Sequence, residues 1–150
     1  MKEYSYDYID GKRVSPLIIT SDFNLLGEHN GTIHVENGTL TISGELHGTL
    51  DVQSSARVII IGKQNGTVSL ESGASVVVYG QVNGTTNLNY NSSLVIEVGG
   101  KLAGTLVNNG KVIVRGAFGG AQSGQGELTV EGNGSIKQPI IKDGISYYQW

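Results

Sequence analysis

The chain has 150 residues, the size of one domain, and can bury a modest core. Glycine is abundant, at 23 residues, whereas the net charge is only −3, and the chain lacks the basic block that would favour nucleic acid as a partner. Cysteine is absent, which excludes disulfides and thiolate metal sites, and no apolar run is long enough for a transmembrane helix.

Residues 1–22 form a non-repeating segment, which we expect to cap one end of the molecule. Tyr4, Tyr6 and Tyr8 alternate with other residues, and Asp10-Gly11 is a dipeptide typical of a β-hairpin turn. The opening residues contain no apolar signal-peptide core. The sequence therefore predicts a cytoplasmic protein that does not insert into a membrane.

Residues 23–136 repeat one pattern with a period of about 18 residues. Each repeat opens with Gly-Thr, passes through two short strands separated by a polar corner, and closes on glycine and a short third segment. The Gly-Thr pairs begin at positions 31, 48, 66, 84 and 104. Alternating apolar residues predict strands, and glycine and asparagine at fixed intervals predict corners. Because so short a repeat cannot bury its own apolar face, the repeats should stack.

We therefore predict an all-β fold, a single-stranded parallel β-solenoid (β-helix) of about seven coils, with non-repeat caps at both ends. At about 4.8 Å per coil the rod would be roughly 30 Å long. The hexapeptide pattern of left-handed helices is absent, so we expect right-handed winding. Four inward columns are predicted: Leu50, Val68 and Thr86; Val52, Leu70 and Leu88; Val58, Val76, Leu94 and Val112; and Ile60, Val78, Ile96 and Val114.

Residues 137–150 depart from the repeat and form the second end segment. They contain Asp143-Gly144, and then three aromatic residues, Tyr147, Tyr148 and Trp150. Two interpretations are open, because a solenoid must either close its ends or associate through them. The aromatic residues either cap the last coil or bind a partner protein.

The second strands of the coils carry apolar residues at outward positions, where a monomer would carry polar ones. One outward column holds Ile59, Val77, Val95 and Ile113, and the next begins with Ile61 and Tyr79. We call these six residues the apolar strip; stacked, they would expose a few hundred Å². Either the strip is an interface with a second copy or another protein, or residues 1–20, with Tyr4, Tyr6 and Leu17, fold over it.

The three histidines occupy three different positions in the repeat. His34 points outward from a first strand, His47 takes the place of a corner asparagine, and His29 fits neither position. A metal site would need them to converge with a carboxylate such as Glu36 or Glu45. We predict surface and corner histidines, with no metal and no cofactor. The corner asparagines are expected to stack as a ladder: Asn30, Asn65 and Asn83.

Catalytic residues are not predicted. Glycoside chemistry needs paired carboxylates on one face, but the outward Asp51 has Ser69 and Asn87 as its stacked neighbours. The glycine-rich residues 116–126 lack the Lys-Ser/Thr ending of a phosphate-binding loop. We interpret this stretch as a looser last coil.

The glycine-punctuated strands, such as residues 48–52 and 57–62 (GTLDV and RVIIIG), resemble the core of bactofilins. Bactofilins are bacterial polymer-forming cytoskeletal proteins with a right-handed triangular β-solenoid. The resemblance covers roughly residues 23–134 and implies a bacterial, self-assembling structural protein. Bactofilins typically carry disordered tails, whereas this chain has aromatic ends, and the resemblance transfers no functional residues.

Together these features favour a non-enzymatic structural protein that forms homodimers through the apolar strip. One alternative is a cytosolic protein-binding module, such as an immunity-type inhibitor or an adaptor, that uses its flat face or aromatic tail. Another is a carbohydrate-binding or carbohydrate-active β-helix. The expected partner is a second copy of the chain or another protein.

Overall fold

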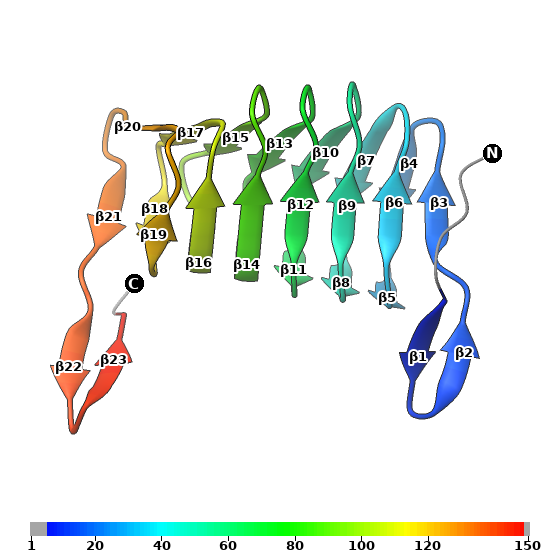
Figure 1. Cartoon of the computed structure of the whole chain (residues 1–150), viewed down its shortest axis with the longest axis horizontal. Helices are drawn as coiled ribbons and strands as arrows, with labels where there is room; N and C mark the ends of the chain where they lie inside the picture. Colours follow the sequence, from blue (N-terminus) through cyan, green and yellow to red (C-terminus); the bar gives the residue numbers. More distant parts are fainter. Residues whose placement is uncertain (1–5, 149–150) are drawn as a thin grey trace.

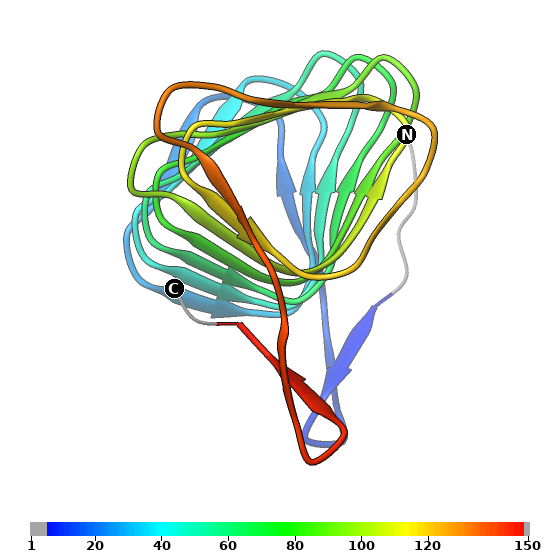
Figure 2. The same ribbon diagram turned by 90° about the vertical axis from the view of Figure 1, so that its left-hand side faces the viewer.

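The computed structural model describes residues 6–148, which form an all-β rod with three flat sides (Figure 1). Viewed along the rod with the C-terminal coils nearest, the chain runs counter-clockwise as it approaches the viewer (Figure 2). The solenoid is therefore right-handed and triangular in cross-section, as predicted. No helix occurs in the described part of the chain, and thus none that could span a membrane.

Each coil contributes one strand to each side of the rod, and strands on one side are parallel and in register. The first side comprises β3 (Leu17–Ile19), β6 (Ile33–Val35), β9 (Leu50–Val52), β12 (Val68–Leu70), the second halves of β14 (Gln81–Leu88) and β16 (Lys101–Asn108), and β19 (Gln122–Ser123). The second side comprises β4 (Phe23–Leu25), β7 (Thr39–Ile42), β10 (Arg57–Ile60), β13 (Ser75–Val78), β15 (Ser93–Ile96), β17 (Lys111–Val114) and β20 (Glu127–Val130). The third side comprises β5 (Glu28–Asn30), β8 (Glu45–His47), β11 (Lys63–Asn65), the first halves of β14 and β16, β18 (Ala117–Gly119) and β21 (Ser135–Lys137).

The core is a set of side-chain columns that run the length of the rod. Ile60, Val78, Ile96 and Val114 stack in register and are each 0% exposed. The other predicted inward columns are buried in the same way. Alternation places every second residue inside, and stacking joins the coils into one continuous apolar interior. The predicted inward columns are confirmed.

Polar side chains interrupt the apolar columns at several positions, among them Thr86, Gln64 and Asn108. Thr86 follows Leu50 and Val68 in its column, and Gln64 follows Leu46 on the third side. The Gln64 Nε2 donates to a backbone carbonyl, whereas its Oε1 and the Thr86 Oγ1 have no hydrogen-bond partner among the described residues. An unsatisfied buried polar atom costs about 1–3 kcal/mol.

Glycine allows the coils to turn and to approach each other at the corners. Gly66, where the third side meets the first, has φ +131°, and a Cβ there would overlap the carbonyl oxygen of Gly48 in the preceding coil. Gly62 lies where the second side meets the third, and a Cβ on it would overlap the carbonyl oxygen of Gly44. Gly62 does not have a left-handed φ, so glycine is required at this position only because there is no space for a side chain.

The non-repeat ends are antiparallel hairpins. β1 (Asp7–Ile9) pairs with β2 (Lys12–Val14) through the predicted turn at Asp10-Gly11, whose φ values are 51° and 76°. β22 (Ile140–Lys142) pairs with β23 (Ile145–Tyr147). Both hairpins project from the same edge of the rod, one at each end (Figures 1 and 2). They lie beside the ends rather than across them, so the inward-facing Phe23 and Val130 stay 45% and 44% exposed.

The stacked strands extend beyond the expected limits of the solenoid. β3 already stacks on β6, so coil structure begins at Leu17, inside the segment 1–22 assigned to the cap. At the other end β21 stacks on β18 as far as Lys137. Neither terminal coil opens with the Gly-Thr pair that marks the repeat.

Candidate functional site

The apolar strip lies on the second side of the rod. Ile59, Val77, Val95 and Ile113 stack in register and are half-buried by one another, while Ile61 and Tyr79 at the adjoining corner are 53% and 50% exposed. In the same column Thr41 precedes Ile59 and Thr129 follows Ile113. Polar residues therefore bound an apolar surface that spans the four central coils.

The described part of the N-terminal segment does not cover this strip. Leu17 belongs to β3 on the first side, and Tyr6 is 49% exposed, with the Arg13 guanidinium 4.6 Å from its ring centre. The β1–β2 hairpin projects from the corner opposite the second side (Figure 2). Tyr4 lies outside the described residues. A cover formed by residues 6–20 is thus wrong.

Charged residues flank the strip. Glu97, Arg115 and Glu131 continue the corner column, and the Arg115 Nη1 and Nε donate to Glu97 and Glu131 at 2.8 and 3.0 Å. The hydrogen bond to Glu131, together with the charge of Glu97, raises the pKa of Arg115 further above its ordinary value. The Arg115 side chain therefore stays protonated and positively charged. Arg57 and Lys111 are exposed at the other edge of the same side.

The predicted aromatic tail is only partly described. Tyr148 is half-buried, the backbone of Tyr147 belongs to β23, and the side chain of Tyr147 and all of Trp150 lie outside the described residues. The same hairpin exposes three isoleucines that sequence reasoning did not single out, at 50%, 71% and 55%: Ile140, Ile141 and Ile145. In the sequence, two consecutive isoleucines close to an Asp-Gly turn could have indicated this exposed apolar hairpin.

The three histidines do not converge. His34 points outward from the first side, as predicted, and its Nδ1 lies 2.8 Å from the Asp51 Oδ2. His29 points inward instead, stacks on Leu46, and has a buried Nε2 without a hydrogen-bond partner in the described structure. The prediction of a surface or corner position is wrong for His29, because it fills the inward column of an end coil.

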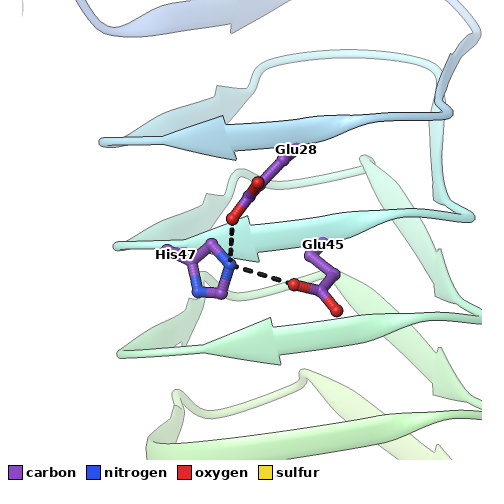
Figure 3. A group of neighbouring side chains, drawn as sticks. All are labelled: Glu28, Glu45 and His47. Carbon is purple, nitrogen blue, oxygen red and sulfur yellow. Dashed lines mark hydrogen bonds and ion pairs between the residues drawn. The ribbon is translucent and has the colours of Figure 1, made fainter.

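The side chain of His47 contacts two carboxylates on the third side (Figure 3). Its Nε2 lies 2.9 Å from the Glu28 Oε1 and 3.1 Å from the Glu45 Oε2. Glu28 and Glu45 are stacked partners on β5 and β8. The sequence pointed to Glu45 as a possible ligand but not to Glu28, because Glu28-His29-Asn30 belongs to the first coil, which lacks the Gly-Thr start of the repeat.

The predicted asparagine ladder meets His47 from the other side. The Asn83 Nδ2 donates to the Asn65 Oδ1 at 2.9 Å, and the Asn65 Nδ2 lies 3.2 Å from the His47 Nδ1. Asn30 occupies the same column one coil earlier. His47 does stand in an asparagine position, and its two ring nitrogens face different groups: carboxylates at Nε2 and an amide at Nδ1.

A shallow groove follows the corner between the first and second sides near the C-terminal end. It is lined by amide, hydroxyl and charged side chains, among them Asn109, Lys111 and Gln125, with Tyr90 73% exposed beside them. The glycine-rich stretch supplies Gln125 and Gly126 to this groove. An exposed aromatic ring beside amides suits the chemistry of sugar binding, but no catalytic pair of carboxylates lies among the described lining residues.

Comparison of the chain with models of protein families, with curated proteins and with solved structures found no match. The resemblance to bactofilins therefore stays an expectation.

Proposed function

We propose that the protein is a non-enzymatic structural protein of the cytoplasm that associates with itself through the apolar strip. The observation that carries this proposal is the column of Ile59, Val77, Val95 and Ile113, which stacks in register on a flat side and is not covered by the described part of the N-terminal segment. Contiguous apolar surface of this kind marks interaction sites on proteins. A flat sheet also matches a second copy of itself, since sheets pack face to face about 10 Å apart.

The size of the strip sets the expected strength of the association. Stable interfaces bury about 800 Å² on each partner, and the strip alone offers a few hundred. The flanking columns with Arg57, Lys111 and the Glu97–Arg115–Glu131 group must supply the remainder. We therefore expect a dimer that dissociates on dilution and is sensitive to salt.

The test is the solution mass by light scattering on a sizing column, over a range of protein concentrations. Val77→Lys places a charge at the centre of the strip without touching the core, since Val77 points outward. Ser69→Lys is the matched control, because Ser69 points outward from the first side of the same coil. A wild-type dimer that Val77→Lys alone converts to a folded monomer supports the proposal; a wild-type monomer at all concentrations refutes it.

The C-terminal hairpin favours a second candidate, a protein-binding adaptor or immunity-type inhibitor. The β22–β23 hairpin projects from the rod (Figure 1), and its three isoleucines are exposed, so they can contact a partner. In this case the chain should be monomeric and should bind one specific protein. Ile141→Lys should abolish that complex in a pull-down while Ser69→Lys retains it; loss with both variants would argue against the hairpin.

A further inference from the structure

We propose that Glu28, Glu45 and His47 form a binding site for one divalent transition-metal ion, with Zn²⁺ as its natural probe. One ligand atom from each residue lies within 4.8 Å of the others. Two carboxylate oxygens with one imidazole nitrogen favour a borderline ion such as Zn²⁺ over Mg²⁺ or Ca²⁺, which prefer oxygen alone. The site is independent of self-association, because it lies on the third side and the apolar strip on the second.

The geometry already approaches that of a coordinated ion. Metal–ligand bonds of about 2.0–2.1 Å place the ligand atoms of a tetrahedral zinc roughly 3.3 Å apart. The Nε2 of His47 now lies 2.9 and 3.1 Å from the two carboxylate oxygens. Small movements of these partly exposed side chains would admit the ion. Three protein ligands leave a fourth position open for water or an outside ligand.

The negative charges of Glu28 and Glu45 favour the binding of a cation between the first two coils. Glu28 and Glu45 are directly opposed in a parallel pair of strands, and like charges in opposed positions destabilise a sheet. His47 lies on the strand that carries Glu45, and its Nε2 contacts both carboxylates (Figure 3). An ion held there would neutralise both carboxylates and would join the first coil to the second.

The asparagine ladder can support the histidine in its metal-binding form. An ion at Nε2 requires the ring proton on Nδ1, which must then donate to an oxygen. Turning the amide of Asn65 presents its Oδ1 to His47 and its Nδ2 to Asn83, whose amide turns in the same way so that its Oδ1 accepts from Asn65. The next residue in the column is Ala103, whose methyl group forms no hydrogen bond that would oppose the turn.

The ion would stabilise the first coil, which stacks on another coil on one side only. The first coil has no coil before it, and its inward Phe23 is 45% exposed. Glu28 belongs to this coil, whereas Glu45 and His47 belong to the next. Metal binding should therefore slow amide hydrogen exchange in residues 23–35 more than in the central coils.

The chain itself supplies the best test variant. Asparagine occupies the position of His47 in the coils before and after it, as Asn30 and Asn65, so His47→Asn removes the nitrogen ligand and keeps the corner. Isothermal titration of the EDTA-treated, desalted full-length protein with ZnCl₂ should show one ion per chain. Mg²⁺ and Ca²⁺ at the same concentrations should give no signal.

Four variants complete the experiment. His47→Asn and Glu28→Gln should each weaken zinc binding at least tenfold, and Asn65→Leu should weaken it about 10–100-fold, as for the partner that orients a ligand. His34→Asn, on the first side, should bind like the wild type. Failure of the wild type to bind zinc, or equal affinity and equal exchange protection in His47→Asn, would overturn the proposal.

Discussion

Because the coils approach closely at the corners, we predict that the effect of a glycine-to-alanine substitution on stability depends on whether another coil precedes that corner. Gly27 and Gly62 occupy the same corner, in the first and third coils. A Cβ on Gly62 would overlap the carbonyl oxygen of Gly44, whereas a Cβ on Gly27 meets nothing within 4 Å because no coil precedes it. Neither residue has a left-handed φ, so the two substitutions differ in space alone.

The magnitudes follow from this geometry. Gly27→Ala should raise the free energy of unfolding by about 0.4–1 kcal/mol, because alanine reduces the entropy of the unfolded chain. Gly62→Ala must displace backbone in a packed stack, and the cost should reach about 3 kcal/mol, the upper end for overpacking. Gly66→Ala combines an overlap with φ +131°, and the left-handed conformation adds about 1–2 kcal/mol.

Urea unfolding followed by circular dichroism gives all three free energies, and thermal melts should show Gly62→Ala about 6–12 °C below the wild type. Gly99→Ala isolates the conformational cost, because Gly99 has φ +86° and open space around it. If Gly62→Ala proves no less stable than Gly99→Ala, the coils do not approach as closely as the structure shows and the steric argument fails.

Three further predictions test the core, the register and the surface charges. Thr86→Val should raise the unfolding free energy by about 1 kcal/mol in urea titrations, because the buried hydroxyl has no hydrogen-bond partner in the described structure; a loss of stability would indicate a water-mediated partner. Ile60→Ala should cost about 2–5 kcal/mol, and Ile59→Ala, in the same strand but outward, should cost much less; equal costs would contradict the register. Arg115→Gln removes the cation that Glu97 and Glu131 share from the coils on either side of it. The melting temperature of this variant should therefore fall below that of the wild type at low salt and approach it in 1 M NaCl. A deficit independent of salt would argue against a charge effect.

Much of the candidate site could be anticipated residue by residue. The strip was predictable because Val77 and Val95 stand at outward positions of a clear two-residue alternation, and a fixed period then places them side by side. Glu28 escaped prediction because the first coil has a weak pattern and no glycine-threonine start. Its contact with His47 also depends on side-chain orientation, which periodicity does not specify.

The amino-acid sequence alone determined the coil period, the inward columns, the asparagine corner and the Asp10-Gly11 turn. Each of these follows from local alternation, from residues that accept a turn conformation, and from the need of a short repeat to bury its apolar face. Only the tertiary structure decided that the β1–β2 hairpin leaves the apolar strip uncovered, that His29 turns inward, and that Glu28 meets His47. Those outcomes depend on the direction in which a non-repeating segment leaves the rod and on contacts between side chains of neighbouring coils, and neither is encoded in the spacing of residues along the chain.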